Sequence, residues 1–136
     1  MEQLSVNNDR ATFTCLIADD SEFARKNIAK IVSVVGGEIV GEAKTGEEAL
    51  ELYSRLNPDL VLLDITMPVL DGVDTLRRIM ETNKNAKVIM VSSIGHKEMV
   101  WRAICLGAKH FVTKPYTPEY VSTIIKAVVE QKGGVQ

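Results

Sequence analysis

The sequence predicts an α/β fold: one doubly wound domain in which a five-stranded parallel sheet carries helices on both faces. Short apolar runs alternate five times along the 136 residues with segments whose apolar residues recur at helical spacing, which is typical of a parallel sheet. The apolar runs are nearly continuous, as in strands that are covered on both faces. We expect this domain over residues 12–132, between a flexible polar tail at 1–11 and a flexible end at 133–136.

The first two strand–helix units are predicted between residues 13 and 57. The apolar run at 13–18 indicates a strand that ends at two aspartates, and Gly36 and Gly37 stop the helix that follows. A second strand near residues 39–40 leads to Thr45 and Glu48, which form a capping box for a helix that ends before Pro58. The apolar positions of the two helices are Ala24, Ile28, Ile31, Val32 and Val35, then Ala49, Leu52, Tyr53 and Leu56.

The other three units repeat this pattern. Strands at 60–63, 88–91 and 111–112 precede helices that begin at Asp71, near Lys97 and at Thr117. Thr117 is an N-cap followed by a proline, and Gly107 stops the helix that begins near Lys97. The apolar stripe of the last helix contains Val121, Ile124, Ile125, Val128 and Val129.

Composition excludes several classes of function without naming one. The formal charge of −2 and the isoelectric point of about 5.7 argue against a nucleic-acid surface, which needs clustered Lys and Arg. The chain contains no apolar run near the roughly 20 residues that cross a bilayer, and no secretory signal, so we expect a cytoplasmic protein without membrane insertion. Cys15 and Cys105 each lie in an apolar segment, so both are expected to be free core thiols.

Polar side chains stand at the ends of four predicted strands. Asp19 and Asp20 follow the first, Asp64 the third, Ser92 the fourth and Lys114 the fifth. Parallel sheets bind ligands outside the carboxyl ends of their strands. Any one of these residues could be a helix cap or a solvated side chain, but their joint placement at one edge predicts a site.

The residue types at this edge indicate metal-assisted phosphoryl chemistry. Crowded carboxylates repel one another and need a cation. Few oxygen ligands with open water positions suit Mg²⁺ better than Ca²⁺, and no Cys or His accompanies the acids to favour zinc. A carboxylate beside such an ion can attack a phosphoryl group, while a lysine and a hydroxyl balance charge on the transferred oxygens.

With these residues the chain resembles the receiver domains of two-component response regulators (CheY-like), over about residues 13–131. The motifs that carry the resemblance are Asp19-Asp20, the run Asp64-Ile65-Thr66-Met67-Pro68 with Asp71-Gly72, Ser92, and Lys114-Pro115. The resemblance implies a flavodoxin-like sheet of strand order 2-1-3-4-5. It also implies a phospho-accepting switch, with only self-directed phosphotransfer and autodephosphorylation, in place of an enzyme.

The resemblance further assigns a role to each site residue. Asp64 would accept the phosphoryl group from a sensor histidine kinase or phosphotransfer protein, and Lys114, in a cis peptide bond with Pro115, would pair with its oxygens. Asp20 and Asp64 would ligate Mg²⁺ directly, Asp19 through water, and Thr66 through its backbone carbonyl. Ser92 would move toward the phosphoryl group, and Phe111 would swing inward with it.

The helix at 97–106 is the candidate output element. It places apolar residues on more than one face, including Val100, Trp101 and Ile104, whereas a surface helix needs one apolar stripe. Deep packing would explain this pattern, but we favour a docking surface. The resemblance places the contact with a downstream protein on the fourth helix, fifth strand and last helix.

Several alternatives remain open at this level. The chain leaves no room for an effector domain, so we expect a stand-alone, chemotaxis-type regulator; a receiver from a larger regulator or a phosphorelay intermediate is the alternative. An aspartyl-phosphate phosphohydrolase would need a second acid where Thr66 stands. A nucleotide or flavin binder would need a Gly-rich loop where the chain has Asp19-Asp20-Ser21-Glu22.

Overall fold

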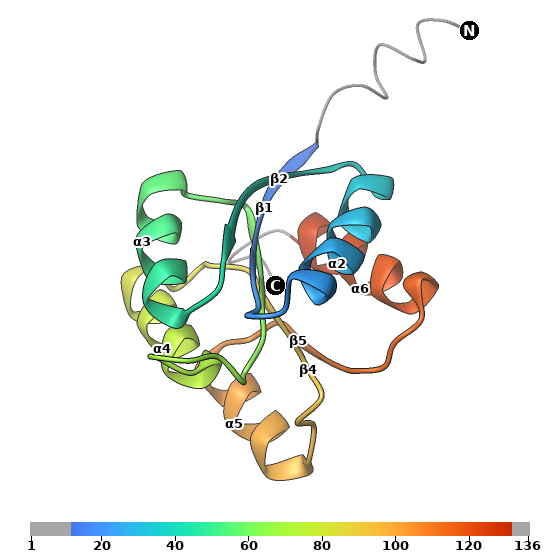
Figure 1. Cartoon of the computed structure of the whole chain (residues 1–136). Coiled ribbons are helices and arrows are strands. Elements are labelled where there is room, and N and C mark those ends of the chain that lie inside the picture. The colour runs from blue at the N-terminus through green and yellow to red at the C-terminus, as the bar shows by residue number, and fades with distance from the viewer. Residues whose placement is uncertain (1–11, 132–136) are drawn as a thin grey trace, which may run out of the picture.

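The computed structural model of the protein describes residues 12–131. The expected tail at 1–11 and end at 133–136 lie outside the described residues. Within residues 12–131, five strands alternate with five helices, as the sequence predicted (Figure 1). The elements are β1 (Phe13–Ala18), α2 (Glu22–Val34), β2 (Gly37–Ala43), α3 (Gly46–Leu56), β3 (Leu60–Leu63), α4 (Gly72–Thr82), β4 (Val88–Ser92), α5 (Lys97–Leu106), β5 (His110–Thr113) and α6 (Pro118–Glu130).

The strands form one parallel sheet of order β2-β1-β3-β4-β5, which confirms the predicted flavodoxin-like topology. The order reverses between β1 and β3, because the chain first adds β2 on one side of β1 and then builds β3, β4 and β5 on the other. In such sheets the crevice at this reversal lies outside the carboxyl ends of the strands. The fold therefore directs the ends of β1 and β3 toward one potential site.

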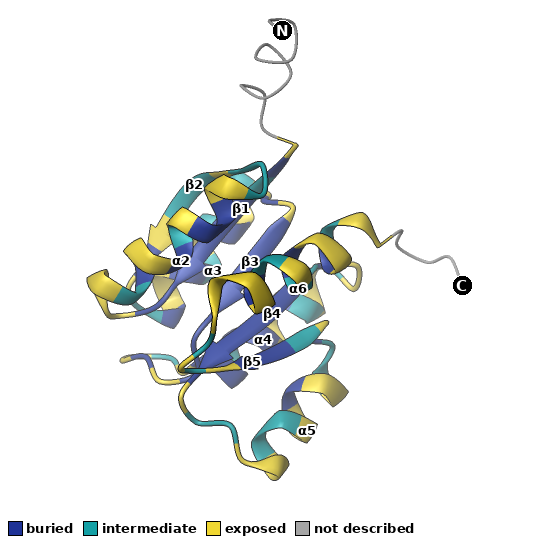
Figure 2. Cartoon of the chain, turned by 90° about the vertical axis from the view of Figure 1, so that its right-hand side faces the viewer, coloured by how far each residue is buried: buried dark blue, intermediate teal, exposed yellow. Residues whose placement is uncertain are grey.

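Two hydrophobic cores lie on opposite faces of the sheet. Successive residues of a strand point to opposite faces, so Cys15 and Ile17 of β1 join one core while Leu16 and Ala18 join the other. Helices α2 and α6 cover the first face, and α3, α4 and α5 cover the second (Figure 1). Strands β1, β3 and β4 are almost wholly buried between these layers, whereas the helices expose their outer sides (Figure 2).

Local capping sets where most helices begin. Side-chain oxygens of the residues that precede α2, α3, α4 and α6 accept backbone N–H bonds at 2.9–3.1 Å, which satisfies donors that have no partner inside the helix. Those residues are Ser21, Thr45, Asp71 and Thr117. The predicted capping box at Thr45 differs from the usual arrangement in one contact. The Glu48 carboxylate accepts from the Lys44 N–H and not from the Thr45 N–H.

The structure corrects one expectation about the cysteines. Cys15 is fully buried in β1, but Cys105 is exposed on α5. The residues around Cys105 are apolar in sequence, yet the inward face of this helix is occupied by Ala103, and Cys105 lies on the outer side. None of the described helices is both long and apolar enough to cross a membrane.

Candidate functional site

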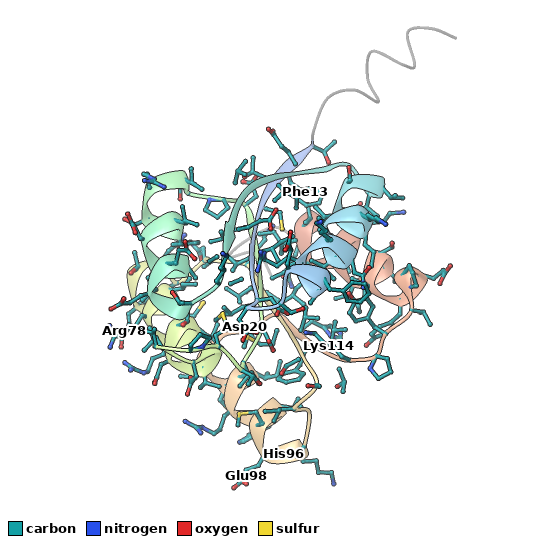
Figure 3. All side chains as sticks on the ribbon, in the orientation of Figure 1. Phe13, Asp20, Arg78, His96, Glu98 and Lys114 are labelled. Carbon is teal, nitrogen blue, oxygen red and sulfur yellow. The ribbon has the colours of Figure 1, made fainter. Side chains whose placement is uncertain are left out.

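Backbone hydrogen bonds between neighbouring strands continue for one residue beyond the strand ends, and they bring the residues that follow the strands together. The Asp64 N–H donates to the carbonyl of Ala18 at 2.9 Å, and the Lys114 N–H donates to the carbonyl of Ser92 at 3.0 Å. These bonds hold the carboxyl ends of the strands at one edge. Asp20 and Lys114 lie at this edge, away from Phe13 at the start of β1 (Figure 3).

Three carboxylates form a compact cluster at that edge. One oxygen of each of Asp19, Asp20 and Asp64 lies within 4.8 Å of the others. Asp19 and Asp64 are each 6% exposed, whereas Asp20 faces solvent. The cluster offers both buried and solvent-exposed carboxylate oxygens, which suits a hard cation that keeps water in its coordination shell. The sequence predicted this grouping from strand ends alone, and the residues present fit such an ion.

Asp19 is anchored through all its polar groups. Its N–H donates to the carbonyl of Ala43 at 3.0 Å, and its Oδ1 accepts from the Ser21 N–H at 2.9 Å. Its Oδ2 accepts from Lys114 Nζ at 2.8 Å, and its backbone carbonyl accepts from Arg25 Nη1 at 2.8 Å. The Asp20 side chain has no hydrogen bond to another described residue, so it depends on its backbone for its position.

The charges of the cluster shift two pKa values. Burial raises the pKa of the Asp64 carboxyl, and the charge of Asp19 raises it further, while Lys114, the Ser92 hydroxyl and the Thr66 backbone amide oppose the shift. Burial lowers the pKa of Lys114, but its hydrogen bond to Asp19 and the charges of Asp64 and Asp19 outweigh that effect and raise the pKa overall. The site therefore favours the charged form of Lys114 and disfavours the charged form of Asp64.

The remaining candidates are Ser92 in β4, Phe111 in β5 and Thr66 after β3. Ser92 is fully buried at the end of β4, and its hydroxyl accepts from the Ile94 N–H at 3.2 Å. Phe111 is 9% exposed and packs in the core with α3, α4 and α5, so it occupies an inward position in this structure. Thr66 is exposed in the loop after β3.

The loop after Asp64 is held closely against the start of α4. The Gly72 N–H donates to the carbonyl of Ile65 at 2.8 Å, and a Cβ at Gly72 would overlap the carbonyl of Asp64. Only a glycine permits this approach of two backbone segments. On the other side of the site, the Lys114–Pro115 peptide bond is cis, as the sequence interpretation expected.

A largely apolar groove of about 570 Å³ opens beside the site, between α2 and α6. Phe23 and Val34 of α2 line it and are 75% and 83% exposed. Lys114 and Tyr116 line it as well, and both also border Asp64 in a smaller pocket. The groove therefore adjoins the pocket that contains Asp19 and Asp64.

On α5 the structure settles which apolar side chains face solvent. Trp101 is 69% exposed and Ile104 is 41% exposed, whereas Val100 packs against the core. Tyr120 of α6 is 47% exposed and makes an edge contact with His110 of β5. The expected output face thus carries exposed large apolar groups, which is typical of a contact surface.

Sequence reasoning missed Arg25 and Glu42. Arg25 is 6% exposed, and its Nε donates to Glu42 Oε1 at 2.8 Å. A signal was present, because Arg25 lies three and seven residues before Ile28 and Val32 on the buried side of α2. A charged residue in a buried stripe requires a partner that hydrogen-bonds to its charge.

A family model described as "Response regulator receiver domain" matches residues 15–126 of the chain. The chain belongs to this family. It is a CheY-type receiver domain, the phospho-accepting module of a two-component response regulator. Such modules are switches and not classical enzymes.

Named relatives of this receiver domain include two chemotaxis proteins CheY. The protein from Thermotoga maritima is 43% identical over 113 residues, which cover 83% of this chain and 94% of the relative. The protein from Treponema pallidum is 39% identical over 122 residues, covering 88% and 85% of the two chains. Among solved structures, a chain of the CheX–CheY–BeF3–Mg²⁺ complex from Borrelia burgdorferi is 40% identical, with a TM-score of 0.85 and coverage of 89% of this chain and 92% of that one.

Proposed function

We propose that this receiver domain accepts a phosphoryl group on Asp64 from a sensor histidine kinase or phosphotransfer protein in a chemotaxis-type pathway. The observation that carries the proposal is the convergence of three carboxylates within 4.8 Å of one another, with Lys114 hydrogen-bonded to one of them. The likeness to chemotaxis proteins CheY supports the pathway.

Asp20 and Asp64 would hold Mg²⁺ directly, Asp19 through water, and the Thr66 carbonyl would complete the protein ligands. The ion, when bound, supplies positive charge to the oxygens of the transferred group. The solved relative that contains CheY, BeF3 and Mg²⁺ supports this assignment. The negative charge of the cluster favours binding of the cation, because Lys114 alone cannot neutralise three carboxylates.

The chain's own groups divide the transfer between them. An oxygen of the Asp64 carboxylate forms a bond to phosphorus as the bond from phosphorus to the donor's imidazole nitrogen breaks, and that nitrogen keeps the electron pair. Lys114 and the Ser92 hydroxyl then donate hydrogen bonds to the new phosphoryl oxygens. Because Ser92 Oγ now accepts from the Ile94 N–H, its movement would shift the loop that leads to α5.

The two partners would use different faces. The groove between α2 and α6 shares Lys114 and Tyr116 with the smaller pocket that contains Asp64, so a donor seated there would present its phosphoryl group near Asp64. A downstream protein would contact the face of α5, β5 and α6, where Trp101, Ile104 and Tyr120 are exposed. Trp101 is the single tryptophan of the chain, so its fluorescence reports on this face.

Intact-mass measurement tests the proposal. The protein is incubated with a small acyl phosphate and Mg²⁺, and we expect one added phosphoryl group that is absent with EDTA and in Asp64→Asn. Asp71→Asn is the matched control, because asparagine also caps a helix and this variant should be phosphorylated like the wild type. The absence of a mass increase in the wild type with Mg²⁺ present would refute the assignment, and repeated turnover of phosphoesters would favour a phosphohydrolase.

A further inference from the structure

Arg25 is a buried cation in α2 that bonds to the main chain of the acidic cluster and to none of its carboxylates. Its Nη1 donates to the backbone carbonyl of Asp19 at 2.8 Å, and its Nε donates to Glu42 on β2 at 2.8 Å. The Arg25 side chain is 8% exposed and that of Glu42 is 48% exposed, so only one end of the ion pair reaches water. The planar guanidinium thereby connects α2, the end of β1 and the end of β2.

The carbonyl that Arg25 holds belongs to the peptide unit between Asp19 and Asp20. This unit is planar, so fixing its oxygen also fixes the direction in which the chain enters Asp20. The Asp20 side chain has no hydrogen bond to another described residue, whereas Asp19 is held at its N–H and at both carboxylate oxygens. The bond from Arg25 therefore constrains the backbone that carries the Asp20 side chain.

We propose that Arg25 is a positioning residue for the cation site, which aims the Asp20 carboxylate at the ion through the Asp19–Asp20 peptide. This inference rests on the proposed function, because it assumes that the acidic cluster holds a divalent cation. Two other roles would leave a different signature. If Arg25 acted only by its charge, it would oppose cation binding; if it were only a structural link between α2 and β2, it would affect stability alone.

The sign of the change in cation affinity separates these roles. The dissociation constant of Mn²⁺, a paramagnetic stand-in for Mg²⁺, is measured by electron paramagnetic resonance for the wild type, Arg25→Met and Arg25→Lys. The positioning role predicts that both variants bind Mn²⁺ about tenfold more weakly, the effect usual for groups that orient metal ligands. Arg25→Lys keeps the charge but cannot reproduce the two-pronged contact with Asp19 and Glu42.

Each alternative gives a result that would overturn the inference. Tighter binding by Arg25→Met with no change in Arg25→Lys would indicate a charge effect. A lower Tm in both variants with wild-type Mn²⁺ affinity would indicate a structural link only. Lys26→Met, which removes an exposed positive charge from the next position of α2, is the matched control and should bind Mn²⁺ like the wild type.

A further variant keeps the inference testable if the Arg25 variants fail to fold. Glu42→Ala removes an exposed carboxylate and frees the Nε of Arg25, so it should weaken Mn²⁺ binding in the same direction but by less. Normal affinity in folded Glu42→Ala and Arg25→Lys would count against the inference. The proposed function would fail separately, if the wild type neither bound Mn²⁺ nor gained a phosphoryl group.

Discussion

Lys114 Nζ donates a 2.8 Å hydrogen bond to Oδ2 of Asp19, a residue 95 positions earlier in the chain. The lysine lies just after β5 and the aspartate just after β1, so the bond spans the carboxyl edge of the sheet. It neutralises the buried Asp19 and leaves the exposed Asp20 and the buried Asp64 available to a cation. The ammonium is thus already at the site where phosphoryl oxygens would arrive.

Replacing Lys114 should separate phosphoryl transfer from cation binding. We expect Lys114→Met to slow phosphorylation by a small acyl phosphate about 10²-fold, because one charged donor to the transferred group is lost. Divalent-ion affinity should not fall, because the variant removes a competing cation. Rates from intact-mass time courses check this, with the exposed Lys109→Met as control; an unchanged rate in Lys114→Met would contradict it.

Asp20 should destabilise the metal-free protein and stabilise the metal-bound one. In EDTA, Asp20→Asn should raise the free energy of unfolding by about 1 kcal/mol, the repulsion between two charges about 4 Å apart in a water-like medium. With Mg²⁺, the wild type should gain Tm and the variant should gain much less. Thermal unfolding with and without Mg²⁺ tests this. Glu51→Gln, an exposed acid on α3, should keep the full Mg²⁺ effect.

Gly72 should be intolerant of a side chain because its neighbour is backbone. A Cβ at this position would overlap the carbonyl of Asp64 and lie 2.6 Å from Cα of Ile65. We expect Gly72→Ala to cost about 1–3 kcal/mol in urea unfolding and to slow phosphorylation of Asp64. Gly41→Ala is the control, since the atoms nearest to its Cβ would be the terminal methyl groups of the Leu56 and Leu16 side chains and not backbone atoms. Equal stability of the two variants would count against this account.

The two cysteines should differ widely in reactivity. Burial raises the pKa of the Cys15 thiol and excludes reagent, whereas Cys105 is exposed. We expect a maleimide to label one thiol rapidly in the native protein and the second only in denaturant. Cys105→Ser should abolish the rapid phase and Cys15→Ser should retain it. Rapid labelling of both native thiols would contradict the burial of β1.

Phe23 should matter for a protein donor and not for a small one. Its side chain is 75% exposed at the edge of the groove beside the acidic cluster. We expect Phe23→Ala to slow phosphotransfer from a phosphorylated histidine domain while leaving acyl-phosphate phosphorylation and stability near wild type. Trp101→Ala, on the output face, is the matched aromatic control and should leave both rates unchanged. Equal slowing with both donors would point to a disturbed site.

The sequence predicted the elements and the core of the site for local reasons. Strand and helix periodicity, caps such as Thr117 and stops such as Gly107 depend on residues near one another in the chain. The placement of Asp19, Asp64 and Lys114 after strands followed from the rule that parallel strands end at a common edge. The strand order came with the family resemblance, because nothing local specifies which strands are neighbours.

Tertiary packing decided the rest. Cys105 and Val100 lie in the same apolar stretch of α5, but one faces solvent and the other the core, because only one side of the helix packs against the rest of the domain. Arg25, Glu42 and the Asp19 carbonyl come from α2, β2 and the end of β1, and the assembled fold places Arg25 2.8 Å from each of the other two groups. The sequence thus determined which chemical groups the site contains, and the fold decided which contacts hold them in place, because contacts such as Lys114–Asp19 join residues that are distant along the chain.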